Sequence, residues 1–127
     1  MLSPIPSGLL TYSADIKVCT GTDNWEKPEW QTYAVSKVHI QASNEMRRTR
    51  DNMEVVLKSI LFIDGLKSTP SLDYMQLAWE SETGGEEMRA VVYDPSGSMI
   101  GDFRVVSVDA LPDYPSYRIH HYELGLI

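Results

Sequence analysis

The sequence predicts a small all-β fold, an antiparallel β-barrel or sandwich of about six strands with one long mobile loop and at most one short helix. Three observations lead to this prediction. Apolar and polar residues alternate in several short segments, turn-forming residues separate those segments, and strands do not alternate regularly with helices. The 127 residues fit a single domain, spanning 1–127.

The first half of the chain contains three predicted strands. LTYSADIKV, residues 10–18, alternates with a period of two, which is typical of a half-buried strand. The turn-forming TGTDN follows, and WQTYAVSKVHIQAS, residues 30–43, predicts a long second strand. EVVLKSILFID, residues 54–64, is rich in β-branched and aromatic residues and predicts the third.

The second half predicts three more strands and one ambiguous segment. MRAVVYD (88–94) and FRVVSVDAL (103–111) are joined by the turn-forming PSGSMIGD, and YRIHHYELGLI (117–127) forms the last strand. In PSLDYMQLAWESE, residues 70–82, Ser71 could cap a helix in which Leu72, Met75 and Trp79 recur at helical spacing. The same segment could equally be extended.

Charge and cysteine content restrict the class of protein. The net charge is −7, and between Asp73 and Asp94 six carboxylates face a single cation, Arg89. Such a segment repels phosphate, so the protein is not expected to grip DNA over its whole surface. Cys19 is the single cysteine, and a buried free thiol suits a reducing cytoplasm. The start MLSPIPSGLL does not read as a signal peptide or anchor, and no apolar run reaches the ~20 residues of a membrane span, so we expect a soluble intracellular protein with no membrane contact.

Catalytic and metal-binding patterns are missing from the sequence. Neither C-x-x-C nor H-x-x-x-H spacing occurs, and His120 and His121, as neighbours in a strand, should point to opposite faces. His39 and Cys19 would be the remaining, distant ligands. A nucleophile elbow and a phosphate loop are also absent. We therefore expect no catalytic residues, no metal and no cofactor, and a chain that is not an enzyme.

Four stretches of the chain carry a resemblance to a known family. PIPSGLLTYSADI, TGTDNWEKPEW, VHIQASNEMRRTRDN with the following LKSILFID, and the ending HHYELGLI occur in this order. Together they resemble the minor capsid proteins of tailed phages that infect Firmicutes, which are head-completion, or head-tail connector, proteins of the stopper type. The likeness is most specific at HHYELGL and weakens between about Leu66 and Met88.

This resemblance implies a structural protein of the virion neck. Subunits of this type assemble in a ring under the portal and its adaptor, close the DNA channel after packaging and provide the docking surface for the tail. The implied partners are the portal and adaptor ring proteins, tail-joining or tail-tube proteins, further copies in a hexameric or dodecameric ring, and packaged double-stranded DNA contacted non-specifically. The implied location is the head-tail interface of the virion, after assembly in the host cytoplasm.

The polar stretch at residues 43–54 is the predicted channel gate. It contains three arginines and two methionines but no Gly or Pro, so it is too long and too irregular for a tight turn. A plain alternative is a solvated loop whose arginines pair with Glu45, Asp51 or a neighbour's acids. The resemblance favours a loop that projects into the channel, whose residues are Ser43, Asn44, Glu45, Met46, Arg47, Arg48, Thr49, Arg50, Asp51, Asn52 and Met53.

Two further regions are predicted to make subunit or connector contacts. The N-terminal arm, residues 1–8, cannot be a central strand because of its prolines, yet Leu2 and Ile5 need covering; a disordered leader is the alternative. Trp25 in the first turn region is a candidate interface residue, whereas Trp30 is expected in the core. The last strand should seal the barrel or lie at a ring interface, and its candidate contact residues are Tyr122, Leu124, Leu126 and Ile127.

Two other functions stay open on the sequence alone. A tail-to-head joining or tail-completion protein would also form a ring and would differ in its binding partner. A metal-dependent small β-barrel enzyme would differ by holding a stoichiometric metal ion. The number of subunits in the ring, and whether the ring forms before docking, do not follow from the sequence.

Overall fold

The computed structural model describes residues 6–48, 53–113 and 118–127, and it confirms the all-β prediction. Its elements in chain order are η1 (Ser7–Leu9), β1 (Tyr12–Thr22), β2 (Pro28–Ala42), β3 (Met46–Arg48), β4 (Glu54–Val56), β5 (Ser59–Asp64), α1 (Tyr74–Gly84), β6 (Arg89–Tyr93), β7 (Met99–Asp113) and β8 (Arg118–Leu126). Leu2 and Ile5 of the predicted N-terminal arm lie outside the described residues, and the end of that arm, from Ser7, enters a 3₁₀ turn.

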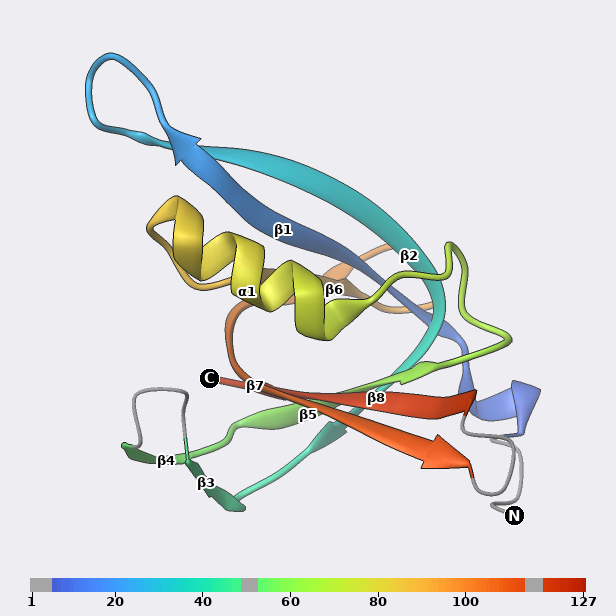
Figure 1. Cartoon of the computed structure of the whole chain (residues 1–127). Coiled ribbons are helices and arrows are strands. Elements are labelled where there is room, and N and C mark those ends of the chain that lie inside the picture. The colour runs from blue at the N-terminus through green and yellow to red at the C-terminus, as the bar shows by residue number, and fades with distance from the viewer. Residues whose placement is uncertain (1–5, 49–52, 114–117) are drawn as a thin grey trace.

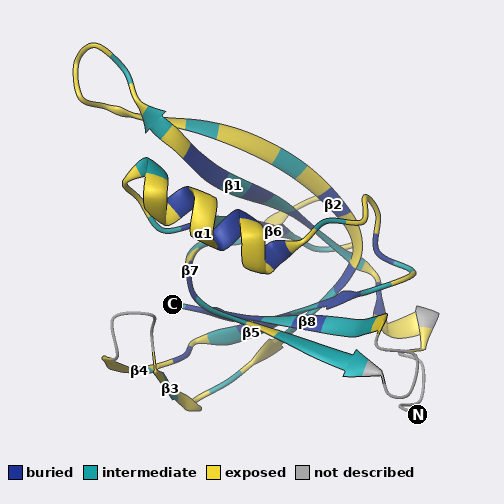
Figure 2. Cartoon of the chain, in the orientation of Figure 1, coloured by how far each residue is buried: buried dark blue, intermediate teal, exposed yellow. Residues whose placement is uncertain are grey.

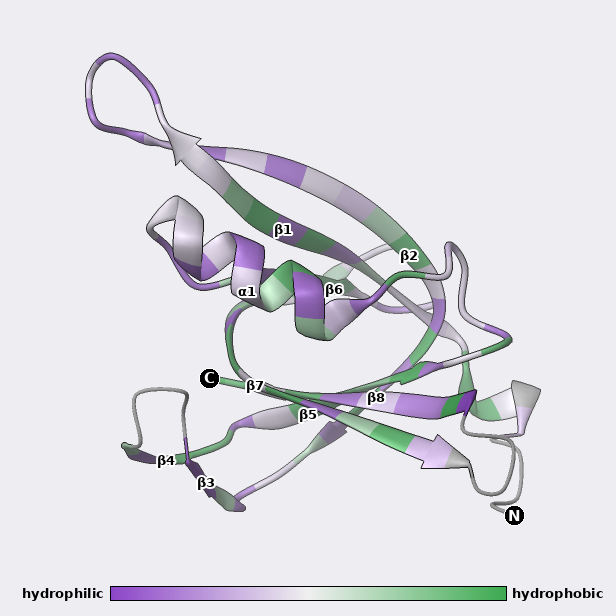
Figure 3. Ribbon diagram, in the orientation of Figure 1, coloured by the Kyte–Doolittle hydropathy of each residue, from purple (hydrophilic) through white to green (hydrophobic). Residues whose placement is uncertain are grey.

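Six of the strands form a closed antiparallel barrel in the order β1-β2-β5-β8-β7-β6 (Figure 1). Its interior is filled by the apolar residues that alternate along the strands, such as Ile16 of β1, Val38 of β2 and Leu61 of β5. Green, apolar segments accordingly concentrate in the barrel strands, whereas the loop that joins β1 and β2 is pale to purple (Figure 3). The period-two pattern therefore identified strands such as β1, in which one face is buried.

The C-terminal strand, β8, lies between β5 and β7 in the sheet and pairs with both, which closes the barrel. Leu124 lies opposite Leu61 on one side and Val108 on the other. The side chains of Tyr122, Leu124 and Leu126 are buried in the barrel core. Their predicted role at a subunit interface is therefore wrong, and the alternative that this strand seals the barrel is correct.

A short strand leaves a seam in the barrel, and α1 fills it. β6 pairs with β1 only from Ser13 to Lys17, so the rest of β1 loses that neighbour. The Ser81 hydroxyl of α1 accepts a hydrogen bond from the backbone N–H of Cys19 at 2.9 Å and donates one to the Glu86 carbonyl at 2.8 Å. A Cβ at Gly84 would collide with the Cys19 carbonyl, so this close approach requires glycine.

The ambiguous segment is a helix, but its buried face differs from the predicted one. Met75 and Trp79 are 45% and 54% exposed, whereas the buried positions are Tyr74, Leu77, Ala78 and Ser81 (Figure 2). The N-cap is Asp73, whose carboxylate accepts from the backbone N–H of Gln76 at 3.2 Å, and not Ser71. The sequence left helix and extended structure open for this segment, and the structure shows a helix. Met75 and Trp79, which recur at helical spacing, lie on its solvent side.

Residues 43–54 were predicted to be an irregular loop. The described part of this segment instead forms the outer end of a β-hairpin. The β2–β5 ladder continues through Ser43 N–H to Lys58 O at 2.9 Å and Leu57 N–H to Glu45 O at 2.8 Å. Beyond it β3 pairs with β4, with Met46 opposite Val56. We call residues 43–57 the outer hairpin. Thr49, Arg50, Asp51 and Asn52 of the predicted gate lie outside the described residues.

The helix cap provides a test of the fold. We expect Asp73→Ala to lower the free energy of unfolding by about 1 kcal/mol, because it removes the side-chain acceptor of the first turn. Ser71→Ala, a matched control two residues away, should change it by less than about 0.5 kcal/mol. Urea unfolding followed by circular dichroism measures both. An equal loss in the two variants would contradict the assignment of the cap.

Candidate functional site

The outer hairpin is seated on the outside of the barrel by a second, small apolar cluster. Leu57 is buried there with Ile60 and Val106, and the half-buried Ile127 packs against them. A Cβ on Gly125 would lie 3.0 Å from Leu57 Cδ2, so glycine at this position makes room for the hairpin. Ile127, which the sequence predicts as an interface residue, is partly buried against this cluster.

Val106 of β7 contributes an apolar side chain to this second cluster. Val105 belongs to the barrel core and the next residue, Val106, to the outer cluster, because side chains alternate along a strand. The β7–β8 register shifts between Val105 and Ser107, opposite Gly125. This β-bulge adds one residue to β7, so that Val108 is again opposite Leu124 on the core side.

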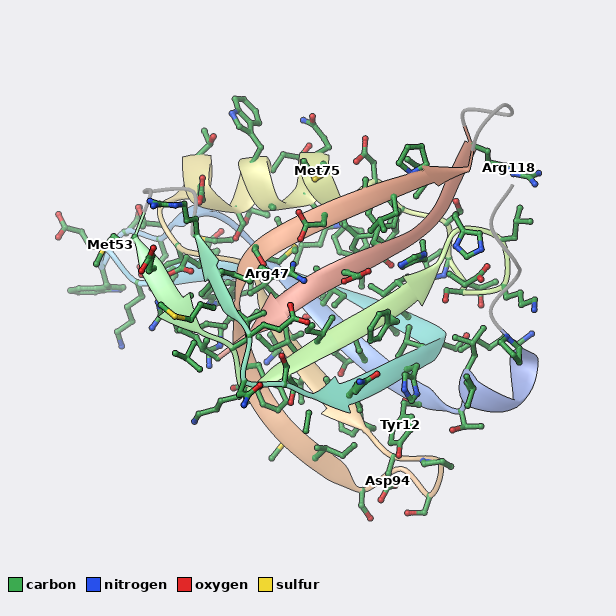
Figure 4. The ribbon with its side chains drawn as sticks, turned by 90° about the horizontal axis from the view of Figure 1, so that it is seen from below. Tyr12, Arg47, Met53, Met75, Asp94 and Arg118 are labelled. Carbon is green, nitrogen blue, oxygen red and sulfur yellow. The ribbon has the colours of Figure 1, made fainter. Side chains whose placement is uncertain are left out.

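Arg47 of β3 joins the hairpin to the barrel through three carboxylates. Its guanidinium contacts Glu45 Oε2 at 3.0 Å, Glu123 Oε1 at 3.5 Å and the carboxylate of Asp109 (Figure 4). Asp109 and Glu123 face each other in the β7–β8 ladder, a pairing of like charges that is unfavourable without a cation. We call these four residues the Arg47 cluster.

The Arg47 cluster keeps its arginine charged. Burial lowers the pKa of Arg47, but hydrogen bonding to Glu45 and the charge of Asp109 outweigh it, and the pKa is raised overall. The Arg47 side chain is only 23% exposed. Arg47 therefore acts as an anchor on the inner face of the hairpin, and the ion pair with Glu45 that the solvated-loop alternative expected is present.

The outer face of the same hairpin is exposed and carries apolar side chains beside the ion pair of Arg48 with Glu54. Because side chains alternate along a strand, Arg47 and Val55 turn inward while their neighbours Met46 and Val56 turn outward. Met46, Val56 and the adjoining Met53 are all exposed. The hairpin thus has a charged anchor on one face, and exposed, adaptable apolar side chains beside an ion pair on the other.

The two neighbouring histidines meet, contrary to the prediction that they point apart. His120 Nδ1 lies 2.7 Å from His121 Nδ1, and His121 Nε2 lies 3.0 Å from Glu123 Oε2. His120 lies where the β7–β8 register is irregular, between the pairs Leu111–His121 and Pro112–Ile119, so strict alternation fails there. Within 6–48, 53–113 and 118–127 no group of three or more His, Cys, Asp or Glu side chains could hold a metal ion.

The remaining candidate residues are dispersed over the molecule. Trp25 lies at the tip of the β1–β2 turn and is 83% exposed. Trp30 is half-buried near that turn and does not belong to the core cluster. Cys19 is a buried free thiol, as expected, and its Sγ donates to the carbonyls of Gly21 and Gly84 at 3.4 Å.

Sequence reasoning missed the two barrel carboxylates that hold Arg47. A signal was available, since Asp109 and Glu123 both fall on the polar faces of predicted strands. The pattern cannot show that they are neighbours, because the register of β7 against β8 brings them together. Comparisons with protein-family models, curated proteins and solved structures gave no match for the chain. In the part that the structure describes, no helix is long and apolar enough to cross a membrane.

The Arg47 cluster can be tested by removing its cation. We expect Arg47→Met to lower the free energy of unfolding by about 1 kcal/mol, because partly exposed ion pairs are individually weak and Asp109 and Glu123 then face each other uncompensated. Hydrogen exchange of the Leu57 amide should become faster. Arg48→Met is the control, since its ion pair with Glu54 joins two exposed side chains on the hairpin itself. Equal effects in the two variants would show that Arg47 does not anchor the hairpin.

Proposed function

We propose that this protein is a head-completion subunit of a tailed-phage neck. Copies of the chain form a ring under the portal and adaptor, close the DNA channel after packaging and present the docking surface for the tail. The observation that supports the proposal best is the outer hairpin, a projecting element that is anchored on one face and carries exposed apolar side chains on the other. The resemblance of the sequence to stopper-type connectors assigns the gate to this same segment.

The outer hairpin has features suited to a gate at the centre of a ring. Gating requires an element that keeps its base fixed while its end changes position. The base here is held by Leu57 against Gly125 and by the Arg47 cluster. The exposed Met46, Met53 and Val56 would meet equivalent side chains of neighbouring copies, and methionine packs adaptably in such contacts.

The charges of the hairpin divide into two roles in this proposal. Arg47 is neutralised by carboxylates and holds the hairpin on the barrel. Arg48 is exposed, and Arg50 follows it in the sequence, so these two would carry positive charge toward the DNA end. The acid-rich segment from Asp73 to Asp94 would repel phosphate elsewhere, which lets the duplex slide during packaging and ejection.

Deletion of the gate tests the proposal. Replacing residues 46–56 by an Asn-Gly turn joins Glu45 to Leu57, which are already hydrogen-bonded, so the barrel should stay folded. We expect this variant to assemble on heads but to let packaged DNA leak from tailless heads. The measurement is nuclease-protected DNA per head. Full retention of DNA by heads that carry the shortened protein would reject the gate.

A charge variant provides the matched control. Changing Arg48 and Arg50 to Gln should weaken DNA retention, and the difference from the unchanged protein should be largest at low salt, because added salt already weakens phosphate contacts. Changing Arg89 and Arg104 to Gln removes the same charge from residues paired with Asp102 and Glu87 and should leave retention unchanged. Attachment to portal-adaptor complexes without tails distinguishes this function from tail completion, for which the chain would instead copurify with tail tubes.

A further inference from the structure

One edge of β2 is a sheet edge that the described part of the chain leaves unpaired. β1 pairs with one side of this strand, whereas on the other side β5 pairs only with residues 38–42, and Thr69 forms a single bridge with Ser36. Among the described residues, no strand pairs with this second side over residues 28–35. We call this side of residues 30–34 the free edge of β2.

The bridge at Ser36 identifies which backbone groups point toward the free edge. Its N–H donates to the Thr69 carbonyl at 2.8 Å and its carbonyl accepts from the Thr69 N–H at 3.3 Å, so both groups point away from β1. The β1–β2 register is regular from Ser36 back to Trp30, and backbone directions repeat at every second residue of a strand. Trp30, Thr32 and Ala34 therefore each present an N–H and a C=O on the free edge of β2.

The free edge of β2 lacks the features that commonly protect an edge strand. Residues 30–34, WQTYA, contain no Lys, Pro or Gly, and no register shift falls within them. All five are exposed or half-buried (Figure 2). The corresponding edge of β1, in contrast, is covered by α1 through Ser81 and Gly84. A regular and uncovered edge of this kind can accept a further strand through main-chain hydrogen bonds.

The N-terminal arm, residues 1–8, has a sequence suited to such an added strand. Pro4 and Pro6 have no N–H, and their alternate spacing places both on the same edge of an extended chain. Ser3 and Ile5 then keep their N–H groups on the other edge. Proline is accepted in an edge strand when its missing donor faces away from the neighbouring strand. One edge of the arm can therefore pair, and the other cannot.

Neither the N-terminal arm nor the free edge of β2 is charged. Residues 1–14 and 30–36 contain no Asp, Glu, Lys or Arg, in a chain whose net charge is −7. Pairing between them therefore places no like-charged side chains opposite each other. It also brings the apolar Leu2 and Ile5 to an edge that contains the half-buried Trp30.

The arm of the same chain is too short to pair there. The Leu9 N–H donates to the Pro6 carbonyl at 3.0 Å, and the Leu9 carbonyl lies 3.1 Å from His39 Nδ1. Thr32 is separated from His39 by about 23 Å along β2. Ile5 is bonded to Pro6, so its Cα is only about 4 Å from that of Pro6. An arm whose Ile5 pairs beside Thr32 therefore belongs to a second copy.

We propose that residues 2–6 of one copy add as a strand to the free edge of β2 in the next copy. The backbone groups of Ser3 and Ile5 pair there with those of Thr32 and its outward-facing neighbours. The contact joins two different surfaces, and a head-to-tail contact of this kind closes into a ring when the rotation permits. The inference rests on the proposed ring and names the segment and the edge that join its copies.

Disulfide crosslinking of the full chain tests the contact. Ile5→Cys protein is mixed with Thr32→Cys protein at the highest soluble concentration and oxidised, and mixed disulfides are counted by mass spectrometry. Cys19 is buried and should not react. The control partner is Thr22→Cys, an exposed position on the neighbouring strand β1. We expect crosslinks to Thr32→Cys at least about fivefold in excess, because a disulfide forms only between closely approaching Cβ atoms. Equal yields, or no crosslinks, would overturn the proposal.

A chain that carries both Ile5→Cys and Thr32→Cys distinguishes a second copy from the same chain. We expect its oxidation to give dimers and larger species whose yield rises with protein concentration. A disulfide that closes within one chain in dilute solution would overturn the proposal, because it would show that the arm reaches the edge of its own β2.

A synthetic peptide of residues 1–8, MLSPIPSG, tests the backbone pairing. We expect it to shift the NMR amide signals of the free edge of β2 in the full chain. N-methylation of Ile5 removes a donor from the pairing edge and should weaken binding at least about threefold, the loss expected for one hydrogen bond. N-methylation of Leu2, on the edge that carries the prolines, is the matched control and should change binding little. Equal weakening by the two peptides would contradict the assigned edge.

These measurements need neither heads nor DNA. Loss of the gate function with crosslinking and peptide binding retained would therefore reject the proposed function alone. Absence of crosslinks and of peptide binding, with DNA retained in heads, would reject this contact alone.

Discussion

The architecture depends on one arrangement, the position of the C-terminal strand between β5 and β7. Both ladders must form for the barrel to close, and together they bury Leu124 and Leu126. The β5–β8 pairing joins residues far apart in the chain, such as Leu61 and Leu124, so its formation closes a long loop at an entropic cost that the buried apolar surface offsets. β7 and β8, in contrast, are consecutive strands. The apolar ending of the chain is thus part of the core.

β8 also determines the outer surface of the barrel where the outer hairpin lies. Its inward side chains alternate with Gly125 and Glu123, which face outward. Gly125 provides the space for Leu57, and Glu123 with Asp109 provides the negative charge that Arg47 neutralises. The position of the outer hairpin therefore follows from how the barrel closes, and we propose its use as a gate on that foundation.

The helix α1 covers a strand edge that the short β6 leaves unpaired. Because β6 is short, the free edge of β1 beyond Lys17 would expose unpaired backbone groups. Ser81 satisfies one of them at Cys19, and Gly84 lets the helix approach closely. On the β7 side, a hollow of about 200 Å³ remains between the helix and the strand.

The sequence by itself determined the fold class and the approximate strands, because the alternation of buried and exposed residues is local. The predicted 10–18, 88–94 and 117–127 correspond to Tyr12–Thr22, Arg89–Tyr93 and Arg118–Leu126. Tertiary contacts decided that the polar 43–57 segment pairs as a hairpin, which face of α1 is buried, and that Arg47 meets Asp109 and Glu123. Each of these depends on strand register or on packing between distant segments, and a local pattern of apolar residues carries no information about either.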